Sequence, residues 1–182
     1  MRTLLFVLFL MVSLPVFPQA DTVSHPLFGV AYFPQGGVHP GLALSYERRM
    51  AGTDRFQFLM GAKIGMYYHY RNNTGVFIMA QSGQRYRIYK RLYAEHFIGI
   101  GYLHSFLNGG DAYYVTASGQ IQKASRAGDP HFMPSFSFGP SYRLGDHARI
   151  FLRPMIYWVI PFNQRALVQY AWEAGASFRI KR

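Results

Sequence analysis

The stretch that decides the fold spans residues 55–70 and reads RFQFLMGAKIGMYYHY. Its even positions, from Phe56 to Tyr70, are all apolar or aromatic, whereas its odd positions are mostly polar or very small. Successive side chains of a β-strand point to opposite faces, so a period of two places these two sets on different sides. A helix, with its period of about 3.6 residues, would mix them. The stretch therefore predicts a long strand with one apolar face.

The same alternation recurs along the chain and predicts an all-β protein. We expect eight strands, at residues 27–33, 41–48, 55–70, 75–89, 92–106, 131–143, 148–160 and 167–180. The connections include short ones at 49–54, 90–91 and 144–147, and others at 34–40, 71–74, 107–130 and 161–166 on the opposite side. An even number of strands, many of them longer than the roughly 9–11 residues that cross a bilayer, is typical of transmembrane barrels. We therefore predict an eight-stranded antiparallel up-and-down transmembrane β-barrel.

The first residues have the pattern of a secretory signal peptide. A short basic start at Met1 and Arg2 is followed by an apolar run over 4–16 and by the small residue Ala20. The alternative, a membrane-anchoring helix, would need roughly 20 apolar residues, more than this run offers. We expect a cleaved signal peptide at 1–20 and a single barrel domain at 21–182, located in the cell outer membrane.

Composition narrows the classes of partner and chemistry. The 182 residues are 50% hydrophobic and 18% aromatic, carry a net charge of +11 and contain no cysteine. A basic, aromatic-rich chain could bind nucleic acid, but secretion argues against such a partner. The absence of cysteine excludes disulfides, thiolate metal sites and a lipid-modified cysteine anchor.

Most of the basic residues map to the strand ends that are expected on the periplasmic side. We interpret them either as snorkelling strand-end residues or as a collar that contacts anionic phospholipid headgroups. This group consists of Arg48, Arg49, Arg55, Arg85, Arg87, Lys90, Arg91, Arg143, Arg149, Arg179, Lys181 and Arg182.

The apolar stripe could line the interior of a soluble β-protein or face lipid on the outside of a membrane barrel. Two observations favour lipid. The polar stripe is rich in glycine and serine, which suits the crowded lumen of a small barrel, and the apolar stripe contains unbroken files of large side chains. Aromatic residues also gather near the strand ends, as they do at the two bilayer interfaces. One belt would consist of Tyr46, Phe56, Tyr86, Tyr142 and Phe178, and the other of Tyr68, Tyr70, Tyr102, Phe106 and Trp158.

Charged residues on the polar stripe would lie in the lumen, where buried charges need partners. Counting back from the turns predicts Glu47 opposite Arg55, Glu95 opposite Arg87 and Glu173 opposite Arg153, with Lys63 on the same stripe. We interpret these residues as structural ion pairs that fill a narrow barrel. A role in gating protons or solutes is the alternative.

A catalytic or metal site finds little support in the sequence. His104 and Ser105 are adjacent, so on a strand they would point to opposite faces and could not act together as base and nucleophile. The seven histidines show no paired spacing, and we expect neither a metal nor another cofactor. The long segment 107–130 is the better candidate for function, because long loops on rigid scaffolds commonly carry binding. Tyr113 and Tyr114 are its candidate binding residues.

Several short motifs resemble those of a known family. The end pattern Glu173-x-Gly175-x-x-Phe178-x-Ile180 resembles the assembly signal on the last strand of outer-membrane barrels. The blocks GIGYLHSF at 99–106, FMPSFSFG at 132–139 and FLRP at 151–154 resemble small members of the outer-membrane protein β-barrel domain family, of the OmpA/OmpX type.

The resemblance implies contact with the lipid bilayer and lipopolysaccharide, and assembly by the barrel-assembly machinery. We expect a non-catalytic scaffold that displays outer loops, with an envelope protein as a candidate partner. The alternatives are a lipid A-modifying acyl hydrolase or transferase and a narrow solute channel.

Overall fold

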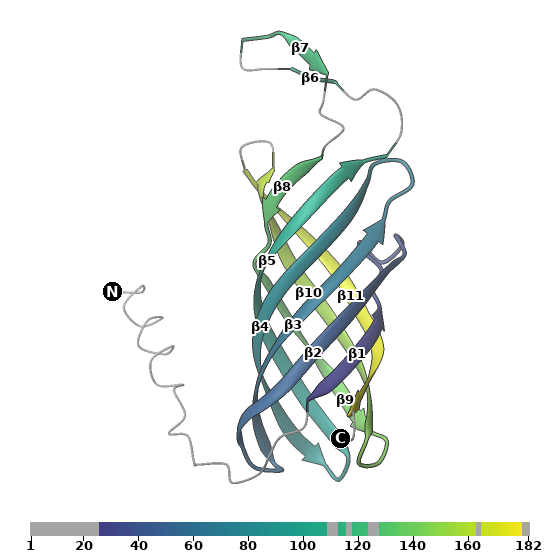
Figure 1. Ribbon diagram of the computed structural model, residues 1–182, viewed down its shortest axis with the longest axis vertical. Helices are drawn as coiled ribbons and strands as arrows, with labels where there is room; N and C mark the ends of the chain where they lie inside the picture. The colour runs from purple at the N-terminus through teal and green to yellow at the C-terminus, as the bar shows by residue number, and fades with distance from the viewer. Residues whose placement is uncertain (1–25, 109–112, 116–117, 124–127, 163–164, 180–182) are drawn as a thin grey trace, which may run out of the picture.

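The computed structural model describes residues 26–108, 113–115, 118–123, 128–162 and 165–179, and within them it is built of β-strands (Figure 1). The predicted signal peptide at 1–20, and Ile180, Lys181 and Arg182, lie outside the described residues. The strands are β1 (Leu27–Tyr32), β2 (Gly41–Gly52), β3 (Phe56–Tyr68), β4 (Asn73–Tyr89), β5 (Leu92–Leu107), β6 (Tyr113–Val115), β7 (Ile121–Lys123), β8 (Asp129–Phe132), β9 (Ser135–Arg143), β10 (Ala148–Phe162) and β11 (Arg165–Arg179).

Nine of these strands form one closed antiparallel sheet. β1 pairs with β2 on one side and with β11 on the other, so that Val30 lies opposite both Leu44 and Ala176. β8 and β9 both lie between β5 and β10 and together take a single position in the ring. The ring thus has eight positions, which confirms the predicted eight-stranded barrel. The tilted strands surround one axis in Figure 1.

The expected strand at 131–143 is divided at Met133 and Pro134. Pro134 has no amide hydrogen and cannot donate to a neighbouring strand. At the break the Met133 amide donates to the Gly101 carbonyl at 2.8 Å, and the Trp158 amide donates to the Pro134 carbonyl at 3.0 Å. The segment between β8 and β9 therefore remains hydrogen-bonded to both neighbouring strands, β5 and β10.

The ladder between β9 and β10 contains a gap. Its pairs join 141–143 to 149–151 and 135–137 to 155–157, with none between 138–140 and 152–154. Pro140 and Pro154 lie in this gap, and neither can donate a backbone hydrogen bond. The other ladder of β9, to β5, runs without interruption from Ser135 to Tyr142.

The barrel has two distinct ends. The turn end contains the connections 53–55, 90–91 and 144–147 together with Leu27 and Arg179, and the loop end contains 33–40, 69–72 and the described residues between β5 and β8. The expected connection at 161–166 is shorter than predicted, because Phe162 pairs with Arg165. β6 and β7 form a separate two-stranded hairpin that stands beyond the loop end in Figure 1.

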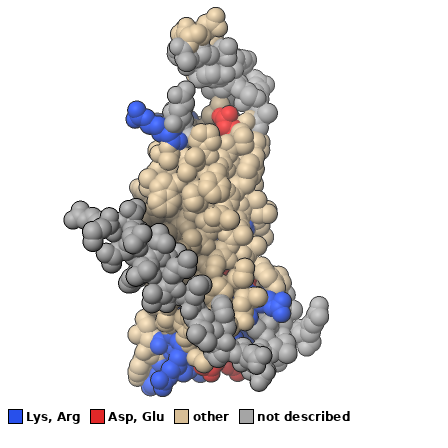
Figure 2. All heavy atoms as spheres, turned by 90° about the vertical axis from the view of Figure 1, so that its left-hand side faces the viewer, with Lys and Arg blue, Asp and Glu red and all other residues tan. Residues whose placement is uncertain are grey.

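The apolar stripe faces outward, as the sequence predicts. Even-numbered side chains of the long strands are exposed, such as Ile98 at 61% and Ile100 at 59%, whereas their odd-numbered neighbours are buried. Figure 2 shows one face of this wall, with charged side chains gathered mainly towards its two ends. Most members of the two expected aromatic belts are exposed, with Phe56 and Trp158 half-buried.

Among the residues that the structure describes, no helix is long and apolar enough to cross a bilayer.

Three cross-strand pairs explain why the inward stripe needs glycine. Tyr67, Phe77 and Phe97 lie directly opposite Gly75, Gly65 and Gly83, respectively. At Gly75 an added Cβ atom would lie 2.3 Å from the Tyr67 ring, closer than any real contact. The ring covers the glycine because the glycine has no side chain, and inward rings and glycines pack against each other in this way.

Candidate functional site: a closed ion cluster in the lumen

Six charged side chains from six strands meet in the turn-end half of the lumen. Each occupies an inward position and is at most 3% exposed. They are Glu47 on β2, Lys63 on β3, Arg85 on β4, Glu95 on β5, Arg153 on β10 and Glu173 on β11. We refer to these six residues as the lumen cluster.

At the centre of the lumen cluster, two arginines bridge the same two carboxylates. Arg85 donates from Nε to Glu95 Oε2 at 2.5 Å and from Nη2 to Glu47 Oε2 at 2.7 Å. Arg153 donates from Nε to Glu95 Oε1 at 2.7 Å and from Nη2 to Glu47 Oε1 at 2.9 Å. All four carboxylate oxygens thus accept from a guanidinium, the charge-assisted arrangement that offsets desolvation best.

The remaining pair completes the charge balance. Lys63 Nζ donates to Glu173 Oε1, and Arg153 Nη1 lies 3.9 Å from Glu173 Oε2. Three carboxylates and three cations give the lumen cluster a formal charge of zero. Because buried ions are costly unless paired, this balance lets them occupy the lumen together.

Aromatic rings hold Arg153 from two sides. Its Cζ atom lies 4.0 Å from the ring centroid of Phe151 and 4.6 Å from that of Phe97. A planar guanidinium can stack on rings while its edge donates hydrogen bonds, which an ammonium group cannot do. The position therefore suits arginine and not lysine.

Two of the three predicted pairs do not form. Glu47 lies opposite Gly61 and not Arg55, because β2 continues to Gly52 and leaves Arg55 in an exposed turn. Glu95 lies opposite Arg85, and Arg87 lies opposite Tyr93.

The third pair, Arg153 and Glu173, does lie in register on β10 and β11. The predicted set also includes Lys63, which lies in the lumen cluster, and omits Arg85. Arg85 and Arg149 were expected among the strand-end basic residues, either as snorkelling side chains or in a headgroup-contacting collar, but both are buried inside the barrel. Both residues have odd numbers, and the odd-numbered side chains of β4 and β10 point inward. The alternation in the sequence could therefore have predicted that both are buried.

An apolar layer fills the loop-end half of the lumen. Its most buried members include Phe33, Leu103, Met133 and Tyr157, none of them measurably exposed. This layer and the lumen cluster together separate a turn-end cavity of about 280 Å³ from a loop-end cavity of about 320 Å³. The described residues thus fill the barrel between its two mouths.

The loop-end mouth is tied together by polar contacts. Gln35 Nε2 donates to Gln169 Oε1 at 2.8 Å, and Thr74 Oγ1 donates to Asn108 Oδ1 at 2.8 Å. The rings of His39 and His69 stack with centroids 3.6 Å apart. Beyond this mouth, the predicted binding residue Tyr113 is 61% exposed on β6. The side chain of Tyr114 lies outside the described residues.

The histidine–serine pair has the geometry expected from the sequence. His104 is on the outer face, where its Nδ1 atom and the Tyr102 hydroxyl are hydrogen-bonded at 2.7 Å. Ser105 points inward and is buried. Within the described ranges, no group of three or more His, Asp or Glu residues is placed to hold a metal ion.

No protein-family model and no curated protein sequence matches the chain. Solved structures with a similar fold include Neisserial surface protein A, with 9% identity and a TM-score of 0.58 over 86% of this chain and 97% of that one. They also include Ail, the attachment invasion locus protein of Yersinia pestis, with 10% identity and a TM-score of 0.51 over 86% of this chain and 97% of that one. With its closed ring of eight antiparallel positions and its outward apolar face, the chain has the fold of the small outer-membrane β-barrel proteins.

Proposed function

We propose that this protein is a non-catalytic scaffold of the outer membrane that presents its loop end to the outside of the cell. The observation that carries the proposal is the filled lumen. The lumen cluster and the apolar layer occupy the space through which a solute would pass. The β6–β7 hairpin forms a sheet of its own and lies beyond the loop end of the barrel (Figure 1).

The proposed surroundings follow from the surfaces. The exposed apolar wall would contact lipid, the loop end would lie among lipopolysaccharide, and the turn end would lie in the periplasm, where short turns are typical. Assembly would require the barrel-assembly machinery. The segment 107–130 is the proposed site for an envelope or surface partner, with Tyr113 as an exposed aromatic anchor.

The orientation can be tested with two matched insertions. Gly119 and Gly145 both have positive φ angles, of 78° and 104°, and an added Cβ at either would meet nothing within 4 Å. One epitope is inserted after Gly119, near the hairpin, and the other after Gly145, in a turn. On intact cells, we expect antibody to label the first and to reach the second only after the outer membrane is opened. Labelling of the Gly145 epitope alone would contradict the proposed orientation.

The scaffold role is tested by removing the loop. Replacing residues 110–128 by a short Gly-Ser linker should leave the heat-modifiable, folded barrel intact, because none of the described residues in this range pairs within the nine-stranded ring. Tyr113→Ala in the full-length loop is a milder variant, because it removes only the exposed aromatic side chain. Loss of the folded form would mean that the segment is structural. Discrete conductance steps of the wild type in planar bilayers would instead favour the channel alternative.

A further inference from the structure

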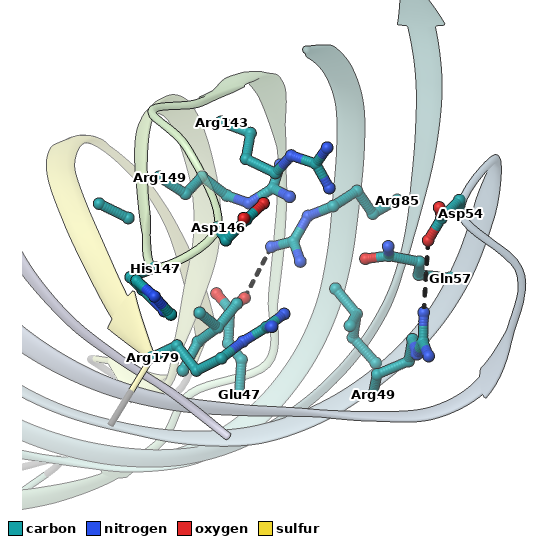
Figure 3. Close-up of a pocket in the computed structure, with 13 residues that line it drawn as sticks. Glu47, Arg49, Asp54, Gln57, Arg85, Arg143, Asp146, His147, Arg149 and Arg179 are labelled. Carbon is teal, nitrogen blue, oxygen red and sulfur yellow. Dashed lines mark hydrogen bonds and ion pairs between the residues drawn. The ribbon is translucent and has the colours of Figure 1, made fainter. Parts of the chain in front are cut away.

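The turn end opens into the cavity of about 280 Å³, and arginine dominates its lining (Figure 3). The arginines are Arg49, Arg85, Arg143, Arg149 and Arg179, and they outnumber the carboxylates Glu47, Asp54 and Asp146. The side chains labelled in Figure 3 converge from β2, β3, β4, β9, β10 and β11 and from the turns between strands.

Arg149 is the unusual member of this lining. It is only 5% exposed, and its Nη1 atom donates to Ser141 Oγ at 2.9 Å while its Cζ atom lies 4.4 Å from the centroid of the Tyr93 ring. No carboxylate of the described residues comes within 4.0 Å of its guanidinium. A cation that has lost its water without gaining a counter-ion is an unfavourable arrangement.

Two of the three carboxylates that line the cavity are engaged elsewhere. Both oxygens of Glu47 accept from Arg85 and Arg153. Asp54 is 72% exposed and lies 4.0 Å from Arg49. Because the charges of the lumen cluster already balance one another, the cluster has no net negative charge to offset that of Arg149.

A second arginine makes the imbalance larger. Arg143 lies directly opposite Arg149 in the β9–β10 ladder, and like charges at such positions repel. Its buried Nε atom has no hydrogen-bond partner among the described residues. Figure 3 shows both guanidinium groups directed towards the same cavity as Arg85.

We propose that this cavity is an anion-binding site for a phosphate group, held between Arg143 and Arg149. Guanidinium groups recognise phosphate through paired, charge-assisted hydrogen bonds, and a phosphate placed here would lie between the guanidinium of Arg143 and the unbalanced charge of Arg149, both of which line the cavity. The volume suits one phosphate ester with a small substituent and lies below the range of larger ligands. The phosphate could belong to a solute or to a phospholipid headgroup at the barrel rim, since both offer the same oxygens.

The test uses the full barrel folded in alkyl maltoside micelles, which contain no phosphate. Sodium phosphate is titrated at constant ionic strength, with chloride as the compensating anion, and the thermal unfolding midpoint is followed together with the arginine Nε–Hε signals. We expect a saturable rise of the midpoint, because a ligand that binds only the folded state stabilises it. The rise should vanish in Arg149→Gln and persist in Arg55→Gln, which removes an exposed arginine at the same end outside the cavity.

A parallel titration with short-chain phosphatidylglycerol in the same micelles distinguishes the two sources. A response to inorganic phosphate identifies a site open to solutes, whereas a response to the lipid alone identifies a headgroup site. If Arg149→Gln fails to fold, Arg143→Gln replaces it, because that side chain is only half-buried. The proposal is overturned if neither phosphate source shifts the midpoint, or if the cavity variants respond as strongly as Arg55→Gln.

Discussion

Arg153 and Glu173 are direct neighbours across the β10–β11 ladder, yet the guanidinium Nη1 stays 3.9 Å from the carboxylate Oε2. Arg153 instead directs Nε and Nη2 across the lumen to carboxylates on β5 and β2. Glu173 is left to Lys63 on β3. Arg153 therefore makes its shorter ionic contacts across the interior of the barrel and not with its register neighbour in the wall.

The first prediction concerns this transverse arrangement. Arg153→Met should destabilise the barrel by about 3–5 kcal/mol, the usual cost of leaving buried charges without their partner. Adding Glu95→Gln should recover part of that loss, because it removes one of the stranded charges. Denaturant unfolding of the four proteins gives the coupling energy. We expect it to exceed the coupling in the matched Arg153–Glu173 cycle, and equal couplings would contradict the geometry.

The second prediction concerns the ring of Tyr67 above Gly75. Gly75→Ala places a methyl group against that ring, and overpacking of this kind costs roughly 1–3 kcal/mol. In a Tyr67→Leu background the same substitution should cost much less, since the ring is gone. The comparison of unfolding midpoints across the cycle isolates the contact. A cost independent of Tyr67 would mean that the strand backbone, and not the ring, opposes the methyl group.

The third prediction tests which face meets lipid. Ala62 is an exposed, outward residue near the middle of β3. Ala62→Arg should destabilise the barrel by about 2–4 kcal/mol in bilayers, the cost of arginine near the midplane. Ala62→Leu is the control of comparable bulk and should be neutral or mildly stabilising. Indistinguishable unfolding free energies for the two variants would show that this face does not contact the hydrocarbon core.

The fourth prediction concerns pH at the loop end. Desolvation and the charge of the stacked His69 lower the pKa of His39 below its ordinary value of 6.5. Because the folded pKa is below the unfolded one, the contribution of His39 to stability is complete above about pH 6.5 and is lost as the pH falls from there through the lowered folded pKa. A ¹H NMR titration should show this lowered midpoint. His69→Asn should raise it towards 6.5, and a midpoint unaffected by that substitution would remove the stacked pair as a cause.

The sequence predicted the faces of the strands far better than their register. Period-two patterning assigns inward and outward residues without any knowledge of the turns, and this is why Lys63, Glu95 and Arg153 were placed in the lumen. Pairing partners depend on where each turn begins. Because β2 extends to Gly52 and does not end at residue 48, the partner of Glu47 is Gly61 and not the predicted Arg55.

Two further features depend on contacts that a linear pattern does not contain. The association of Arg85 and Arg153 with the same carboxylates joins β4 to β10, which lie on separate parts of the ring. The burial of Arg149 under Tyr93 likewise requires β5 and β10 to approach each other across β9. A strand-by-strand reading grouped Arg149 with the exposed basic residues, because proximity through the lumen is a property of the closed ring.

The gap in the ladder between β9 and β10 gives the barrel a preferred line of local opening. Strands held by unbroken ladders exchange their amide hydrogens slowly, whereas a short interruption lowers the free energy needed to separate its two sides. β9 is continuous with β5 but not with β10, so the barrel should open by leaving β9 on the β5 side. Hydrogen exchange should therefore be fastest, among the wall amides, along the β9–β10 boundary and slowest between β4 and β5. Although its ring is closed, such a barrel should fluctuate like an open curved sheet whose edges are β9 and β10.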